Sequence, residues 1–426
     1  MQLLDAFALI ITLTALFAYF NEKFLKLPST IGVTLVGLVA SLFLLAVNAM
    51  GANLVPTAQK VLEQIDFGTF LMEGVLSFLL FAGALNVNAE VLRKYKTPVL
   101  VMAVFSTLIS TFLIGGLTYW ILGLFGMQIP LIYALLFGAL ISPTDPIAVL
   151  DLVKRAKVPQ KLESLIAGES LFNDGVGVVV FAVIASLAFG GGHGGHEAMG
   201  ALDILRLFAQ EALGGALFGA VLGYFAFLML RSIDQYIPEL LITIALVMGG
   251  YALAQTLHVS GPIAMVIAGL IIGQQGRQHA MSDKTREHVD QFWEMTDQIL
   301  NAVLFVLIGL EVLLLKWPDN GHLLLLVMVP VVLAVRWISV GLPVSLLRKP
   351  FALQPYTVRM MTWGGLRGGI AIALALSIPV ESAYRELILT LTYGVVVFSI
   401  LVQGLTVMPL AVKAAAEGSA DVMQNR

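Results

Sequence analysis

The sequence has 426 residues, of which 59% are apolar and only 12% are charged. Soluble proteins carry about 25% charged residues, and a folded chain this apolar cannot cover its surface with polar groups, so its main solvent is lipid. A net charge of −3 excludes the basic field that nucleic-acid binding needs. The absence of cysteine excludes disulfides, thiolate metal sites and thiol nucleophiles. The composition therefore predicts an all-α polytopic membrane protein that does not bind nucleic acid.

Apolar stretches of about 20 residues, the length a helix needs to cross a bilayer, recur along the chain. The first begins without a positive leader or a cleavage site, so we interpret it as a span and not as a removed signal peptide. We expect about 13 spans, at residues 3–20, 30–49, 67–86, 97–124, 129–150, 164–189, 204–230, 236–256, 259–274, 290–315, 321–347, 356–379 and 386–412.

The Lys and Arg residues between the spans predict the orientation. Only four of them follow an even-numbered span, namely Lys60, Arg206, Lys316 and Arg385, and the others follow odd-numbered spans. Because an excess of Lys and Arg marks the cytoplasmic side, we expect the N-terminus outside and the C-terminus in the cytoplasm.

The span 129–150 contains the string SPTDP, in which Pro143 and Pro146 bracket Thr144 and Asp145. Proline removes a backbone donor and pushes the preceding residue out of the α region. Two prolines three residues apart therefore predict an unwound stretch at membrane depth, which is tolerated only inside protein or against water. Its carbonyls, the hydroxyl and the carboxylate would form an oxygen-rich cation site. The alternative is a simple kink in which Asp145 is satisfied locally.

The next span, 164–189, carries a polar stripe in the string GESLFNDGVG. Ser170 and Asp174 are four residues apart and share one helix face, and Glu169 and Asn173 stack beside them. Gly177 and its neighbouring glycines allow another backbone to approach closely. We expect Asp174, Ser170, Thr144 and Asp145 together to bind a monovalent cation. An interhelical polar clamp without an ion is the alternative.

The span 356–379 contains WGGLRGG, in which four glycines surround Arg367 and predict a second broken helix. Spans 5 and 12 run in opposite directions and are seven spans apart. That spacing fits a single membrane domain, 1–426, with repeat 1 at about 1–190, a linker helix at about 204–230 and an inverted repeat 2 at about 236–413. Crossed broken helices in inverted repeats are typical of secondary transporters.

Other ionisable residues lie at membrane depth, where each is costly and indicates function by default. Arg336 needs a buried partner, for which Glu169 is the best candidate, although Arg336 would otherwise extend to an interface. Glu73 in the third span could add a carboxylate to an ion funnel. For Glu211, Glu311 and Arg359 an ordinary place at the membrane boundary is equally open.

The strings LLFAGALNVN, SPTDPIAV, GESLFNDGVGVVVF and WGGLRGGIA strongly resemble the NhaP-type sodium/proton antiporters, which belong to the cation:proton antiporter-1 family and are bacterial relatives of the animal Na⁺/H⁺ exchangers. The resemblance covers essentially the whole membrane domain. It implies a 13-span, two-repeat fold of the NhaA/NhaP type, a homodimer in the bacterial inner membrane, no cofactor, and electroneutral exchange of one cation per proton.

The resemblance also implies roles for single residues. Asp174, next to Asn173, would bind cation or proton, and Thr144, Asp145 and Ser170 would complete the Na⁺ site. Glu169 would form an ion pair with Arg336. Arg367 would act structurally or electrostatically. Many relatives read LLFEGAL where this chain has Ala82, so Glu73 is left as an open candidate for the missing carboxylate.

The expected mechanism is competition, because a proton and a Na⁺ ion neutralise the same buried charge on Asp174. A K⁺/H⁺ antiporter of the same fold is the main alternative, since oxygen ligands alone do not separate Na⁺, Li⁺ and K⁺. An intramembrane aspartyl protease would need Tyr-Asp and Gly-x-Gly-Asp strings, which are missing, and a channel would need a continuous polar pore. We therefore expect a transporter and not an enzyme.

The loop 190–200 contains His193 and His196 among six glycines. Histidines could bind a metal or sense pH near neutrality, but the glycines favour a mobile linker. The segment 277–290, with His279 and His288, is a possible pH-sensing surface, although a solvated connection is the preferred interpretation.

Overall fold

The computed structural model describes residues 3–52, 54–63, 68, 70–87, 89–189, 201–277, 280–315, 321–354 and 356–424. Within these ranges the chain is helical, and its only β-type pairing is one isolated bridge. Nine helices in the described residues are long and apolar enough to cross a membrane, and three shorter apolar helices cover residues 70–85, 131–141 and 261–276. The predicted all-α membrane fold is confirmed, whereas the count of 13 spans stays a prediction.

The chain divides into two compact units. Unit 1 contains residues 1–72, 144–166 and 299–426, and unit 2 contains residues 73–143 and 167–298. Each unit combines segments from both halves of the sequence. This division does not follow the predicted boundaries between the two repeats and the linker helix, so the inverted-repeat organisation stays a prediction.

Unit 1 is built from both ends of the chain and a short middle segment. Its helices are α1 (Leu3–Phe20), α2 (Ser29–Val47), α3 (Val55–Glu63), α9 (Ile147–Arg155), α16 (Gly321–Phe351), α17 (Tyr356–Trp363), α18 (Gly369–Leu376), α19 (Arg385–Phe398) and α20 (Gly404–Gln424), with short π-helical turns at Asn21–Leu25, Asn48–Ala52 and Ser399–Gln403.

Small residues bring α2 against the C-terminal part of α15 (Asp283–Leu310) in unit 1. A Cβ atom on Gly309 would lie 2.8 Å from the carbonyl oxygen of Thr34, so only glycine permits this approach. The Thr34 hydroxyl donates to Phe305 O at 3.1 Å, and the Ser41 hydroxyl donates to Gly309 O at the same distance. Glycine contacts with interhelical hydrogen bonds are the usual way in which helices associate in a bilayer.

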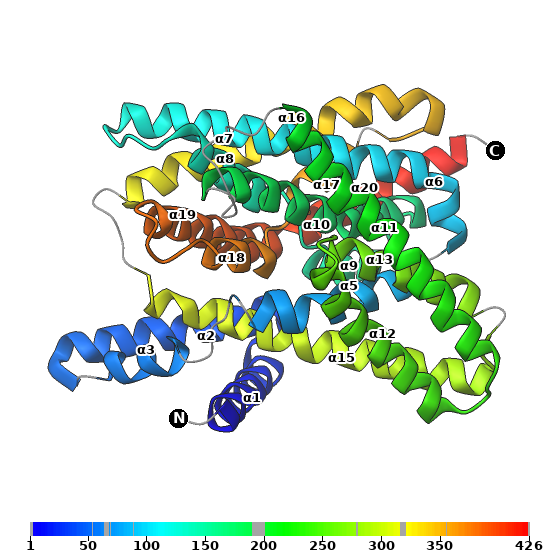
Figure 1. Cartoon of the computed structure of the whole chain (residues 1–426). Helices are drawn as coiled ribbons and strands as arrows, with labels where there is room; N and C mark the ends of the chain where they lie inside the picture. The colour runs from blue at the N-terminus through cyan, green and yellow to red at the C-terminus, as the bar shows by residue number, and fades with distance from the viewer. Residues whose placement is uncertain are drawn as a thin grey trace. The chain divides into compact units, whose positions relative to one another are not determined.

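Unit 2 contains the middle of the chain. Its helices are α5 (Leu76–Leu85), α6 (Ala89–Val101), α7 (Thr107–Leu124), α8 (Leu131–Ile141), α11 (Ala201–Arg231), α12 (Tyr236–Thr256) and α13 (Gly261–Ile271), with π-helical turns at Met102–Ser106 and Ile272–Gly276. The π-helical turn Phe70–Val75 crosses from unit 1 into unit 2 after Met72. The helix α10 (Gln160–Ala188) enters this unit after Ile166, and α15 leaves it after Gln298. In Figure 1, α7 and α8 lie side by side, and α13 packs against α5 and α11.

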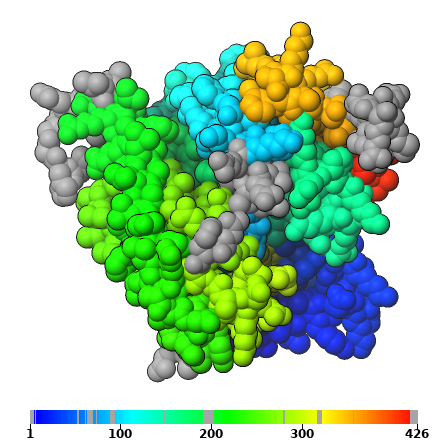
Figure 2. Space-filling model, turned by 90° about the vertical axis from the view of Figure 1, so that its right-hand side faces the viewer, coloured from blue at the N-terminus to red at the C-terminus, as the bar shows by residue number. Residues whose placement is uncertain are grey.

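An exposed apolar stripe on α11 indicates that this helix faces lipid. Large apolar side chains at Leu213, Leu217, Val221 and Phe225 are more than half exposed and recur every four residues, so they form one stripe along the helix. Figure 2 shows α11 in green on the left of the view. A continuous apolar stripe of this kind is stable against lipid and not against water.

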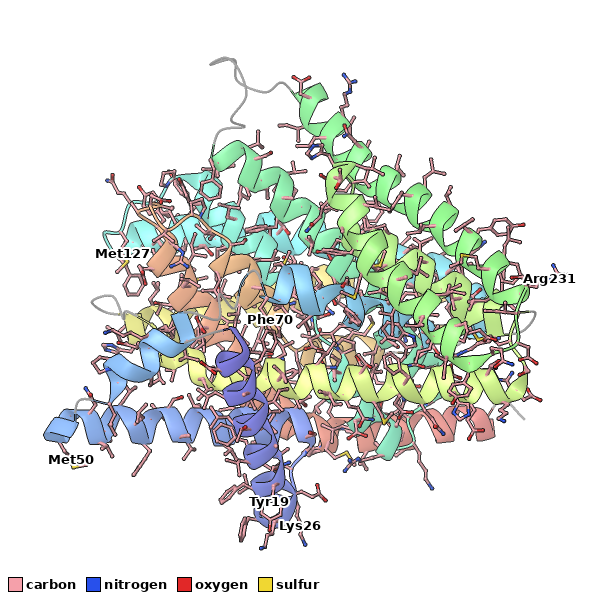
Figure 3. The ribbon with its side chains drawn as sticks, turned by 60° about the horizontal axis from the view of Figure 1, so that its bottom comes forward. Tyr19, Lys26, Met50, Phe70, Met127 and Arg231 are labelled. Atoms are coloured by element: carbon pink, nitrogen blue, oxygen red, sulfur yellow. The ribbon has the colours of Figure 1, made fainter. Side chains whose placement is uncertain are left out.

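The ends of the long helices carry the residues expected at a membrane interface. At the end of α1 the Lys23 ammonium donates to the Tyr19 hydroxyl at 2.9 Å, and Lys26 lies in the same turn (Figure 3). Arg231 ends α11 in the same figure. Tyrosine and basic residues are enriched at the membrane–water interface. Their presence at these helix ends does not test the orientation of the termini, which stays a prediction.

Candidate functional site

The predicted break in span 5 is present. The helix α8 ends at Ile141, α9 begins at Ile147, and the five residues between them are not helical. The carboxylate of Asp145 accepts a hydrogen bond from the backbone N–H of Ile147 at 2.9 Å, so it caps the start of α9. The span is therefore broken and not merely kinked. The local capping bond that we considered as the alternative role of Asp145 is also present.

The predicted break in span 12 is present as well, between Trp363 and Gly369, the end of α17 and the start of α18. The two breaks meet in unit 1, because the backbone N–H of Asp145 donates to Leu366 O at 2.8 Å in an antiparallel bridge. The Asp145 side chain lies against the Cα atom of Gly368, where a Cβ atom would overlap it. The glycine run is therefore needed to let the two unwound segments touch.

Arg336 lies where these breaks meet. It is 2% exposed in the middle of α16, so it does not extend to an interface. Its Nε atom donates to Met361 O at 3.4 Å, and its Nη2 atom donates to the Thr144 hydroxyl at 3.5 Å. One guanidinium thus places a fixed positive charge beside both unwound segments.

Two residues of the last span support the break in span 12, and sequence reasoning missed them. Ser399 accepts from the backbone N–H of Arg367 at 2.9 Å and donates to the Gln403 side chain at 2.6 Å. Gln403 in turn donates to Trp363 O at 3.0 Å. Their spacing of four residues in the apolar string VVVFSILVQGL was the available signal. Together they satisfy backbone groups that the break removes from the helical ladder.

A small cavity adjoins this network in unit 1. Its polar lining comes from Arg336, Arg367 and Gln403, and its volume is about 10 Å³. That is close to the smallest space that holds one water molecule. The cavity provides room for a water molecule between the two arginines, but not for a hydrated ion.

The predicted polar stripe of α10 is buried in unit 2. Glu169, Ser170 and Asn173 are at most 2% exposed, and Asp174 is 8% exposed. The Asn173 amide donates to Glu169 Oε1 at 2.9 Å, and the Ser106 hydroxyl donates to the same oxygen at 3.4 Å. Asn173 and Ser106 therefore hold Glu169 in place one residue round from the Ser170 and Asp174 face.

The glycines of α10 act as predicted. A Cβ atom on Gly177 would overlap the ring of Pro143, the first proline of the break in span 5. The neighbouring Gly175 lies against Ile263 of α13. The absence of side chains at Gly175 and Gly177 thus lets α10 pack against Pro143 and α13, within one turn of Asp174.

The structure brings the predicted site residues together in two sets. Thr144, Asp145, Arg336 and Arg367 belong to unit 1, whereas Glu169, Ser170, Asn173 and Asp174 belong to unit 2. A Na⁺ site that joins the two sets, and the Glu169–Arg336 ion pair, stay predictions.

Some predicted features lie outside the described part of the structure. They are the side chain of Glu73, the residues His193 and His196, and His279. Among the described residues, no group of three or more His, Asp and Glu side chains is placed to hold a metal ion.

Two broken helices that meet at their unwound segments are typical of secondary transporters. Residues 11–413 match the family model described as the transmembrane sodium/hydrogen exchanger. The chain belongs to this family.

Several known proteins are similar to the chain along most of its length. The Na⁺/H⁺ antiporter NhaP of Pseudomonas aeruginosa is 50% identical over 96% of both chains. The Na⁺/H⁺ antiporter NhaH of Halobacillus dabanensis is 36% identical over 92% of this chain and 93% of its own length. The solved structure of the sodium proton antiporter MjNhaP1 of Methanocaldococcus jannaschii matches with a TM-score of 0.76 at 21% identity, over 97% of this chain and all of the other, which supports the fold.

Proposed function

We propose that the protein exchanges Na⁺ for H⁺ across the membrane. The observation that carries this proposal is the buried Asp174 on α10, in a chain half of whose residues are identical to those of a Na⁺/H⁺ antiporter over nearly the whole length of both. A carboxylate at this depth is costly unless it binds a counter-charge. Both a proton and a Na⁺ ion supply that charge.

The two ligands compete in the proposed cycle. Asp174 holds either a proton or a Na⁺ ion, because each neutralises the same carboxylate. Ser170, Thr144 and Asp145 supply the remaining oxygen ligands when Na⁺ is bound, and Arg336 pairs with Glu169. An empty site keeps its negative charge and crosses the low-dielectric interior poorly, so only a loaded site moves.

The coupling ratio follows from the number of carboxylates that cycle. The residue next to Asp174 is the neutral Asn173, and the Asp145 carboxylate already caps α9. One carboxylate that alternates between one proton and one Na⁺ ion gives electroneutral 1:1 exchange. We further propose a homodimer in the bacterial inner membrane, with the N-terminus outside and the C-terminus in the cytoplasm.

Transport in proteoliposomes tests this function. The purified protein is placed in vesicles that contain a pH-sensitive dye. When Na⁺ or Li⁺ is added outside, its movement into the vesicles should drive protons out. Asp174→Asn should abolish that movement while the protein still folds, since a neutral amide is cheaper in the membrane than a carboxylate. Asp151→Asn is the matched control, because Asp151 is exposed on α9 and its one ion pair within the described residues is with Arg155.

Each result of that experiment has a clear meaning. Exchange by the Asp174→Asn variant at the wild-type rate would rule out Asp174 as the carrier. A response to K⁺ equal to that for Na⁺ would replace the proposal with K⁺/H⁺ antiport. A membrane-potential dependence of the rate would contradict electroneutral exchange.

A further inference from the structure

Glu311 is a buried carboxylate that the proposed exchange cycle does not use. It lies in the single 3-10 turn Glu311–Leu313 that follows α15, and 4% of its surface is exposed. Its carboxylate forms no hydrogen bond and no ion pair with the residues that the structure describes. A buried charge without such a partner is costly. Whether Glu311 also lies at the membrane boundary stays a prediction, but its side chain is enclosed by protein.

Two side chains of α19 interact electrostatically with Glu311 in unit 1. The Arg385 guanidinium attracts the carboxylate, although the two form no ion pair. Tyr393 is 3% exposed, and its hydroxyl oxygen faces the backbone of Val312, in the same turn as Glu311, without a hydrogen bond of good geometry among the described residues. Glu311 also acts electrostatically on this hydroxyl. One cation and one buried hydroxyl thus lie within electrostatic range of Glu311.

The other elements around this turn add little charge. The helices α2 and α3 pack against it, and α2 carries no titratable residue. On α3, Lys60 is exposed, and the side chain of Glu63 lies outside the described part of the structure. On α19, Glu386 is half-buried. Arg385 is therefore the cation that the described neighbours offer to Glu311.

Arg385 also binds two backbone carbonyls. Its Nε atom donates to Ile378 O at 2.9 Å and its Nη2 atom to Leu376 O at 3.4 Å. These carbonyls lie at the C-terminal end of α18, where the helix dipole is negative. The helices α18 and α19 pack side by side (Figure 1). The guanidinium is therefore placed between a helix end and a carboxylate.

The opposite end of α18 is part of the break in span 12. The helix has eight residues and starts at Gly369, directly after Gly368, which touches the Asp145 side chain. At about 1.5 Å per residue, a helix this short is only about 12 Å long. The bonds from Arg385 to the C-terminal end of α18 therefore also influence the position of its N-terminal end at the break.

We propose that Glu311 is a second protonation site, separate from the exchange site, whose charge decides how firmly Arg385 holds the end of α18. When Glu311 is protonated, Arg385 keeps its bonds to the α18 carbonyls, which is the arrangement in the structure. When Glu311 is charged, its carboxylate attracts the guanidinium more strongly than neutral carbonyls do. The end of α18 is then released, the break in span 12 loses support, and exchange slows.

Isotope exchange separates this effect from competition at Asp174. The transport readout depends on the proposed function and uses ²²Na⁺/Na⁺ exchange in proteoliposomes, with equal pH and saturating Na⁺ on both faces. Asp174 is then loaded with Na⁺ at every pH, so its own protonation does not enter. The wild-type rate should fall by up to about tenfold per pH unit towards alkaline pH, because one proton leaves Glu311. Glu311→Gln should keep the acid-side rate throughout, and the exposed Glu381→Gln should behave like the wild type.

A second measurement does not need transport. Wild type, Glu311→Gln, Arg385→Gln and the double variant form a cycle of thermal unfolding midpoints in detergent. At alkaline pH the two substitutions should be non-additive by a few degrees, and at acidic pH they should be additive. Tyr393→Phe should change the pH at which this coupling appears.

The outcomes distinguish the two proposals. A coupling between Glu311 and Arg385 that is the same at both ends of the pH series, or absent at both, would overturn this inference. A Glu311→Gln rate that falls with pH as the wild-type rate does would also overturn it. If the wild type carries no Na⁺ at any pH, the proposed exchange function fails, and the unfolding cycle still decides the role of Glu311.

Discussion

Asp145 serves the fold with the same carboxylate that the sequence assigns to ion binding. Its Oδ1 atom caps α9 through the Ile147 N–H, and its backbone N–H joins the two breaks through Leu366. A carboxylate that already accepts a backbone hydrogen bond keeps only part of its capacity for a cation. We therefore assign the alternating charge to Asp174 and a mainly positioning role to Asp145.

This division of roles can be tested by two substitutions at one position. Asp145→Asn should keep the cap, since asparagine also accepts from a backbone N–H, and should retain exchange with a weaker apparent affinity for Na⁺. Asp145→Ala should lose the cap and about 1 kcal/mol of stability. Unfolding midpoints and Na⁺ half-saturation are measured for both. Complete loss of exchange in the stable Asn variant would show that a second carboxylate cycles.

The buried charges of Glu169 and Arg336 lead to a further prediction at this scale. If they pair, removal of either partner leaves an uncompensated buried charge and costs roughly 3–5 kcal/mol. Glu169→Ala and Arg336→Ala should each lower the thermal unfolding midpoint in detergent. The double variant should lose less than the sum of the two. Strictly additive losses would mean that the two side chains do not touch.

At the scale of elements, proline and glycine decide where the helices break and where they can meet. Two prolines lie between the end of α8 and the start of α9, and glycines lie between the end of α17 and the start of α18. The same absence of side chains lets α10 pack against the first break, where Gly177 touches Pro143. Close packing at these points therefore helps to fix the position of the polar stripe of α10.

A side chain at Gly177 should therefore disturb the site without removing any polar group. In Gly177→Val the added atoms meet the Pro143 ring, and overpacking of this kind costs about 1–3 kcal/mol. We expect a lower unfolding midpoint and a slower exchange rate. Gly116→Ala is the control, because a Cβ atom there meets no neighbouring atom, and alanine favours the helix by about 1 kcal/mol. Equal midpoints for the two variants would contradict the packing argument.

At the scale of the whole molecule, exchange requires that proton and cation exclude one another at one carboxylate. Apparent Na⁺ affinity must then depend on pH. In the acidic range each unit drop in pH should weaken Na⁺ binding about tenfold, because one proton must leave before Na⁺ binds. In the alkaline range the affinity should level off. Turnover becomes bell-shaped, since acid blocks Na⁺ loading and alkali blocks proton loading.

The measurement is Na⁺ half-saturation in proteoliposomes across a pH series with equal pH on both faces. A half-saturation constant that stays flat through the acidic range would contradict competition. It would indicate separate proton and cation sites, with Asp145 and Glu73 as the next carboxylates to test.

The sequence by itself determined the class of fold, the two breaks and the polar stripe. These depend on local chemistry. A run of 20 apolar residues is long enough to span a bilayer, closely spaced prolines or glycines weaken a helix locally, and residues four apart share a face. The strings around Asp145, Asp174 and Arg367 could therefore be interpreted without any knowledge of their neighbours.

Only the tertiary structure decided which groups touch. The hydrogen bond between Asp145 and Leu366, the bonds from Arg336 to Met361 and Thr144, and the support of the second break by Ser399 and Gln403 join residues far apart in the chain. The burial of Glu311 was equally hidden, because its depth depends on α2 and α3, which pack against its turn, and not on its own helix. Local patterns show that a polar group is costly in lipid, whereas its partner is set by how distant helices pack.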